Sequence, residues 1–206
     1  MTFLLPALLL VIGVGVFAST MREGLWSNAL TLVNVITAGL IATNVWEPLA
    51  SMLDEQLPSL TFFWDLVLLW ALFAVALLIL RLCSDNVSKV KVRFKKPIDL
   101  FGGLIFAAWV AWVSVCFSAM TLHTAPLTRE FLFKGFRAED QMMFGLAPDR
   151  RWLGFVQRMS LGPFSRVAPQ DDPYAHVFDR HGEFMPKYAS RRGRYDATEG
   201  LFVEDK

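Results

Sequence analysis

Two carboxylates stand beside long apolar stretches, where a charged side chain is costly and is therefore a candidate for function. Asp65 lies near the start of one stretch and Asp99 near the start of the next. An ionisable residue inside a membrane is by default a functional candidate. Both also lie close to a predicted membrane boundary, where the helix dipole favours a carboxylate. Because successive spans run in opposite directions, we expect the two at opposite membrane faces and not as an acid–base pair.

Two amides, Asn34 and Asn44, interrupt a less apolar stretch earlier in the chain. Amide side chains within a membrane span form hydrogen bonds between helices, and they can also line the path of a solute. Hydrogen bonding between helices is the simpler explanation, and the residues alone leave both open.

Four residues of the C-terminal part could ligate a metal: His176, Asp179, His181 and Glu183. Their spacing matches no familiar metal motif, so solvated loop side chains explain them more simply. The sequence has no Gly-rich phosphate loop, nucleophile elbow or HExxH pair. The two cysteines, Cys83 and Cys116, lie in or beside apolar stretches as small core residues do. We therefore expect no cofactor, no metal site and no enzymatic activity.

Four apolar stretches must position these side chains: Phe3–Ser19, Ala29–Pro48, Phe62–Leu82 and Ile98–Leu122. A helix needs about 20 apolar residues to cross the roughly 30 Å hydrocarbon core of a bilayer. The chain of 206 residues is 54% hydrophobic, and most of its charged residues follow residue 122. The sequence thus predicts an all-α protein with a four-helix transmembrane bundle at 1–125 and a polar, partly irregular tail at 126–206. The net charge of +1 gives no reason to expect nucleic acid as a partner.

The connector between the last two stretches is basic and sets the predicted orientation. It holds Lys89, Lys91, Arg93, Lys95 and Lys96. Short loops rich in Lys and Arg stay in the cytoplasm. Counting stretches from this loop places both termini outside the cytoplasm. Because no basic residue precedes the first stretch, we expect a retained span there and not a signal peptide. The predicted location is the bacterial inner membrane.

A row of small residues marks one face of the fourth stretch. Gly103, Ala107 and Ala111 are spaced by four, and such a row lets another helix approach closely. We expect helix packing through this face, and we expect the chain to associate with a second copy or with other membrane proteins within the lipid bilayer.

The tail contains one short amphipathic pattern from Pro148 to Met159. Pro148 and Asp149 are typical of a first helical turn. Apolar residues then recur at i, i+3, i+4 and i+7: Trp152, Phe155, Val156 and Met159. This face could lie in a membrane interface or dock on the membrane domain of the same chain. Beyond Gly162 we expect extended or poorly ordered chain, with a short hairpin near Asp179–Gly182.

Two local patterns resemble a known family. After the first stretch, Arg22 and Gly24 precede a small and hydrophobic run that begins at Ala29. In the fourth stretch, Asp99 and Gly103 open a second pattern that continues to Ala107. Over about residues 1–125 these patterns resemble the colicin V production (CvpA) family.

The chain departs from that family at one place. Val110 and Ala111 stand where the family usually has an Arg-Gly pair, so the intramembrane arginine of the family is missing. The resemblance implies a multi-pass inner-membrane protein linked to colicin V production or export, and no enzyme. We predict a component that supports export or envelope transport by assembling with partners. The alternative is an oligomeric channel or transporter for a small solute or ion, with Asn34, Asn44 and Asp65 near its path.

Overall fold

The protein forms a helix over each of the four predicted apolar stretches, and the helices over the second and third stretches extend several residues beyond them. A computed structural model describes residues 4–57, 61–88, 92, 94–126, 142–165, 171–172 and 174–201, with side chains described as far as Arg194. Within these ranges the chain forms six helices and no strand, which confirms the all-α prediction. The helices are α1 (Leu4–Thr20), α2 (Gly24–Gln56), α3 (Thr61–Val87), α4 (Lys96–Thr124), α5 (Pro148–Leu161) and α6 (Phe184–Leu201).

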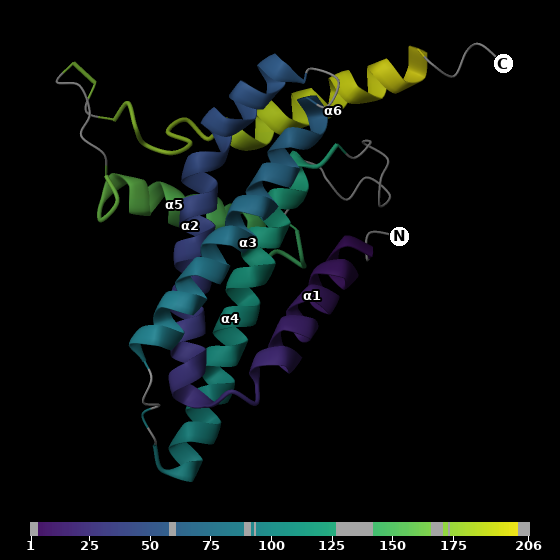
Figure 1. The fold of residues 1–206 in the computed structure, drawn as a ribbon. Coiled ribbons are helices and arrows are strands. Elements are labelled where there is room, and N and C mark those ends of the chain that lie inside the picture. Colours follow the sequence, from purple (N-terminus) through teal and green to yellow (C-terminus); the bar gives the residue numbers. More distant parts are fainter. Residues whose placement is uncertain are drawn as a thin grey trace.

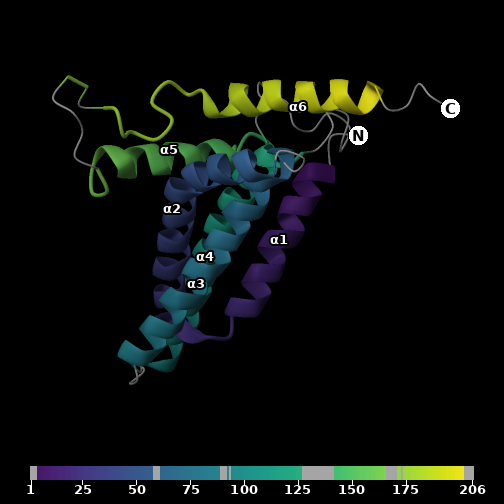
Figure 2. The ribbon, with the colours of Figure 1, turned by 45° about the horizontal axis from the view of Figure 1, so that its top comes forward.

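Helices α1 to α4 run up and down as a bundle, and α5 and α6 lie across one of its ends (Figures 1 and 2). Helix α2 packs on both α3 and α4, and α1 packs on α4. We call the end that carries the α1–α2 corner and the start of α4 the basic end, because Lys95 and Lys96 lie there exposed. The opposite end, covered by α5 and α6, is the tail end.

Three helices, α2, α3 and α4, are long and apolar enough to cross a membrane. Helix α1 is apolar as well but shorter, with 17 residues. At 1.5 Å per residue it extends about 26 Å, close to the thickness of the hydrocarbon core.

Large apolar side chains cover the outer surface of these helices. On α3 and α4 they include Val67, Val75, Leu78, Ile79, Ile105 and Trp109, each more than a third exposed. An apolar surface of this extent is unfavourable in water, and lipid tails solvate it without cost. The outer surface of the bundle is therefore suited to lipid.

The tail helices share their core with the bundle. Trp152 and Val156 of α5 are buried in the same cluster as Trp46 of α2 and Phe117 of α4, and Tyr188 of α6 joins them. The helix predicted from Pro148 is confirmed. Its apolar face docks on the bundle of the same chain, which is one of the two placements that the sequence left open.

The expectation of irregular chain beyond Gly162 was wrong for residues 184–201, which form α6. The expected hairpin at Asp179–Gly182 is a turn that leads into this helix, with left-handed φ angles of 47° at Asp179 and 69° at Gly182. The helix forms because the Asp179 carboxylate accepts a hydrogen bond from the Phe184 N–H (2.9 Å), which satisfies a free donor of the first turn. Phe184 and Tyr188, four residues apart, then bury one helix face on the bundle.

Candidate functional site

The α1–α2 corner meets the first turns of α4 at the basic end. Gly24 opens α2 with φ +80°, a conformation that favours glycine. The Oδ1 atom of Asp99 accepts a hydrogen bond from the Leu25 N–H at 3.0 Å, so a residue of α4 caps the first turn of α2. A Cβ atom on Gly103 would lie 3.0 Å from the Gly24 carbonyl carbon. Gly24, Asp99 and Gly103, which carry the family resemblance, therefore form one helix junction.

Asn28 joins three helices inside this corner. Its Nδ2 atom donates to the carbonyl of Thr20 at the end of α1 (3.1 Å) and to the carbonyl of Gly103 in α4 (2.9 Å). The side chain is fully buried, where an amide without partners would be costly. The sequence reasoning missed Asn28, although a polar residue at the start of a buried helix face, four positions after Gly24, was a usable signal.

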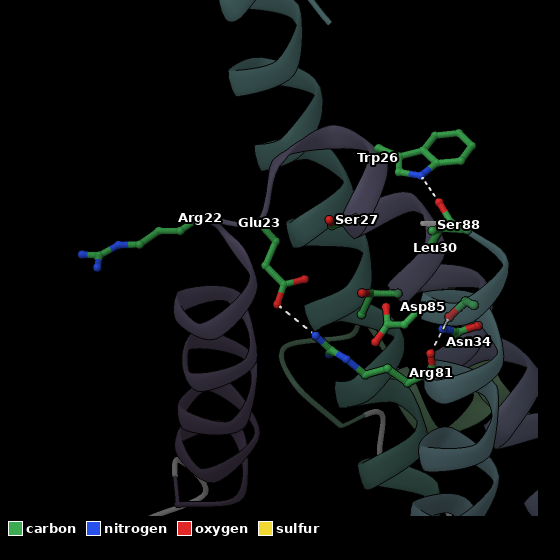
Figure 3. Close-up of a pocket in the computed structure, with 11 residues that line it drawn as sticks. Arg22, Glu23, Trp26, Ser27, Leu30, Asn34, Arg81, Asp85 and Ser88 are labelled. Atoms are coloured by element: carbon green, nitrogen blue, oxygen red, sulfur yellow. Dashed lines mark hydrogen bonds and ion pairs between the residues drawn. The ribbon is translucent and has the colours of Figure 1, made fainter. Parts of the chain in front are cut away.

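A polar cavity of about 270 Å³ opens beside the corner, between the first turns of α2 and the last turns of α3 (Figure 3). Two hydrogen bonds join these helices along its wall. Asn34 Nδ2 donates to Ser84 Oγ, and Trp26 Nε1 donates to Ser88 Oγ, both at 2.8 Å. Asn34 therefore makes a hydrogen bond between helices, as the simpler of its two interpretations requires.

The charged residues of this cavity are two arginines and two carboxylates: Arg22, Arg81, Glu23 and Asp85. Arg81 Nη2 lies 3.4 Å from Glu23 Oε1 and bridges the α1–α2 corner to α3. In Figure 3 the Arg22 side chain extends away from the α2–α3 seam, whereas Arg81 and Asp85 lie along it. The interior thus holds one cation and two carboxylates.

Asp65 lies at the opposite end, where the tail binds it. Its Oδ2 atom accepts a hydrogen bond from the Tyr188 hydroxyl (3.2 Å) and pairs with the guanidinium of Arg191. Arg191 also donates to the carbonyl of Thr61 at the start of α3. Burial and the neighbouring Asp65 carboxylate raise the pKa of Tyr188, so its hydroxyl remains a neutral donor.

Asn44 lines a second polar cavity of about 370 Å³ between α2 and the tail. Its Nδ2 atom donates to the Leu40 carbonyl of its own helix at 2.7 Å. Three of the residues considered as metal ligands also line this cavity, namely His176, Asp179 and Glu183. In the part of the chain that the structure describes, no three His, Cys, Asp or Glu side chains come together as a metal site.

A buried polar pair connects α4 to α5. His123 Nε2 lies 2.9 Å from Asp149 Oδ2, and both side chains are completely buried. Arg192 of α6, only 4% exposed, donates to the backbone carbonyl of His123 at 3.3 Å. Sequence reasoning missed this contact between three helices, because residues 123, 149 and 192 are far apart in the chain and match no motif.

The small-residue face of α4 is used within the chain. Gly103 contacts the backbone of α2, and Ala107 and Ala111 are buried. Val110, which stands where the family has its arginine, is 1% exposed. This face therefore packs against neighbouring helices of the same molecule and leaves no room there for a second chain.

The other two motif residues, Arg22 and Ala29, flank the corner. Arg22 is exposed between α1 and α2, and Ala29 is half-buried in the second turn of α2. Of the basic loop, Lys95 and Lys96 are exposed at the start of α4, and Lys89, Lys91 and Arg93 lie outside the described residues.

Three membrane-capable helices, joined by buried polar contacts at both ends, indicate a membrane protein that is helical over the residues the structure describes. Residues 6–137, more than half of the chain, match the family described as colicin V production protein. The chain therefore belongs to the colicin V production protein family, and the resemblance seen in its sequence is confirmed. A search of curated proteins and a search of solved structures found no match.

Proposed function

We propose that this protein is a four-span inner-membrane component that supports export or envelope transport by assembling with partners, without catalysing a reaction. Helix α1 would be the fourth span. It packs along α4, and its exposed side chains are apolar, including Leu8, Val11 and Val14. The exposed Lys95 and Lys96 at the basic end support a cytoplasmic location of that end, with both termini and the tail outside.

The observation that carries this proposal is the fixed position of the tail on the bundle. The tail is held by the Asp65–Arg191 pair, the His123–Asp149 pair and a hydrogen bond from Trp152 Nε1 to Thr43 Oγ1 (3.2 Å). Polar contacts of this kind, buried and distributed over both tail helices, oppose independent movement of the tail. The tail helices α5 and α6 thus form a surface fixed to the end of a membrane bundle, as a docking platform for envelope proteins would be.

The oligomeric channel has less support. Asn34 and Asn44 line separate cavities at opposite ends of the bundle, and Asp65 is bound to the tail. Asn34 and Asp65 join different helices, and Asn44 bonds to its own helix, so the contacts of these three side chains do not favour one common path.

Site-specific photo-crosslinking in cells tests the assembly. A photoreactive residue at Arg158, which is exposed on α5, is expected to form adducts with a discrete envelope or membrane protein. The same residue at Ile105 or Trp109, on the apolar surface of α4, serves as the matched control and is expected to react with lipid. If the α5 position yields only lipid adducts, the assembly proposal is wrong.

Cysteine accessibility tests the orientation separately. In a variant without Cys83 and Cys116, a cysteine at Lys95 is expected to be protected from an impermeant thiol reagent in intact cells, and a cysteine at Ser190 to be labelled. The opposite pattern would reverse the proposed topology. Ion flux through reconstituted liposomes would favour the channel instead.

A further inference from the structure

Two cavities of different character share one wall at the basic end. The polar cavity described above lies on one side of the α2–α3 seam, and an apolar groove of about 600 Å³ lies on the other. Five residues line both: Trp26, Leu30, Asn34, Ser84 and Ser88. The groove is completed by apolar and weakly polar side chains of α3, namely Leu80, Cys83 and Val87. A polar cavity that continues into an apolar groove on the lipid-facing side of a bundle matches the shape of a phospholipid, with one headgroup and attached acyl chains.

The polar cavity offers groups of both charges at separate places. Arg81 uses one of its five N–H donors on Glu23, so others can face an anion. Among the described residues the Asp85 side chain makes no hydrogen bond or ion pair, and its carboxylate lies on the α2–α3 seam (Figure 3). The hydroxyls of Ser27 and Thr31 add further polar groups to the lining. The cavity can therefore accept a phosphate and a cation at the same time.

We propose that this paired cavity binds a zwitterionic phospholipid with a primary ammonium group, of the phosphatidylethanolamine type. The phosphate binds to the Arg81 guanidinium, the ammonium donates to Asp85, and an acyl chain lies in the groove beside Cys83 and Val87. The bound lipid would join α2 to α3 at the end of the bundle where hydrogen bonds from Trp26 and Asn34 already connect them.

The charges of the cavity favour a phospholipid with a primary ammonium group over the other common phospholipids. An anionic phosphatidylglycerol headgroup has no cation for Asp85 and would add a negative charge beside two carboxylates. A phosphatidylcholine headgroup carries a cation without N–H donors, so it cannot form the hydrogen bonds that a primary ammonium gives to a carboxylate. The preference for the primary ammonium should therefore depend on Asp85, whereas affinity for the phosphate should depend on Arg81.

Native mass spectrometry of the delipidated full-length protein tests the site. Dioleoyl-phosphatidylethanolamine, -phosphatidylglycerol and -phosphatidylcholine are added separately at equal concentration. We expect the ethanolamine lipid to bind about tenfold more tightly than the other two. Asp85→Asn should remove that preference, and Arg81→Gln should weaken all three lipids. The exposed residues Glu55 and Arg158 lie outside the cavity, so Glu55→Gln and Arg158→Gln are charge-matched controls that should change nothing.

The wild-type chain offers a second readout that needs no substitution. Cys83 is exposed in the groove and Cys116 is buried, so maleimide alkylation of the folded protein reports on Cys83. Adding the ethanolamine lipid in detergent should slow this alkylation severalfold in the wild type and leave it unchanged in Asp85→Asn. Equal binding of the three lipids, a preference for phosphatidylglycerol, or alkylation of wild-type Cys83 that is insensitive to the ethanolamine lipid would each overturn the proposal.

Discussion

Gly39 of α2 provides the sharpest test of how the tail is held. The indole of Trp152 lies directly over this glycine and also contacts Phe117, with an edge-to-face ring separation of 5.5 Å. A Cβ atom on Gly39 would lie 2.5 Å from Cη2 and 2.6 Å from Cζ2 of that indole. Carbon atoms pack at about 3.5–4.0 Å, so Gly39→Ala requires α5 to move by about 1 Å or more.

The expected loss of docking free energy comes from overpacking. Overpacking a well-packed site costs about 1–3 kcal/mol. Replacing a helical glycine by alanine also stabilises α2 by up to about 1 kcal/mol, but α2 is helical whether or not α5 is docked, so this gain does not change the docking equilibrium. Complete expulsion of Trp152 would expose roughly 150–250 Å² and cost about 4–6 kcal/mol, so a small displacement of α5 is the cheaper response. We expect Gly39→Ala to weaken tail docking by about 2 kcal/mol, a factor of about 30 in the docking equilibrium.

Hydrogen exchange of α5 amides in detergent measures this docking equilibrium. Gly154→Ala in α5 is the matched control, because no atom lies within 4 Å of a Cβ at that position, and it should protect α5 slightly. Trp152→Phe removes the atoms that clash with the new Cβ, so it should weaken the docking of α5 less in the Gly39→Ala background than in the wild type. The coupling free energy between the two substitutions should be about 1 kcal/mol or more. Unchanged exchange in Gly39→Ala, or strictly additive effects in the double variant, would refute the reasoning.

Substitutions at three further positions test the polar contacts at both ends. Asp99→Ala should lower stability by about 1–2 kcal/mol in thermal unfolding, because the Leu25 N–H loses its hydrogen-bond acceptor. Asp99→Asn should lower stability less. Equal losses of stability in the two variants would show that the hydrogen bond is not the cause. Asp65→Asn leaves the guanidinium of Arg191 without its carboxylate and should weaken the docking of α6 by about 3 kcal/mol. Faster tryptic cleavage within α6 measures this loss, while hydrogen exchange of the α5 amides should stay unchanged. Burial raises the pKa of Asp179 above its ordinary value of 3.8. The protonated form is thus favoured on folding, and this contribution to stability is present at low pH and is lost as pH rises above about 4 through the folded pKa. In Asp179→Asn the side chain stays neutral at every pH and can still accept a hydrogen bond from the Phe184 N–H. The thermal unfolding temperature of this variant should therefore fall less between pH 4 and pH 7 than that of the wild type. Parallel pH profiles of the two unfolding temperatures would exclude Asp179 as the titrating group.

Local patterns in the sequence predicted five of the helices. The structure extends α2 beyond its predicted span, from Ala29 back to Gly24 and from Pro48 on to Gln56, and extends the end of α3 from Leu82 to Val87. Length and continuous hydrophobicity identify a span without knowledge of its neighbours, and the periodicity from Trp152 to Met159 identifies α5 in the same way. The family could also be recognised from short patterns around Gly24 and Asp99. Helix α6 was missed because its own sequence is polar and its formation depends on burying Phe184 and Tyr188 against the bundle.

The sequence by itself determined that this is a helical membrane protein, where five of its helices lie and which family it belongs to, since these follow from composition and from residues close together in the chain. Only the tertiary structure decided what the polar residues do. Asp99 caps a helix that begins 75 residues earlier, and Asp65 pairs with Arg191 across 126 positions. A buried charge or amide is stable only where a partner reaches it, and partners that distant are placed by helix packing, which no local pattern records.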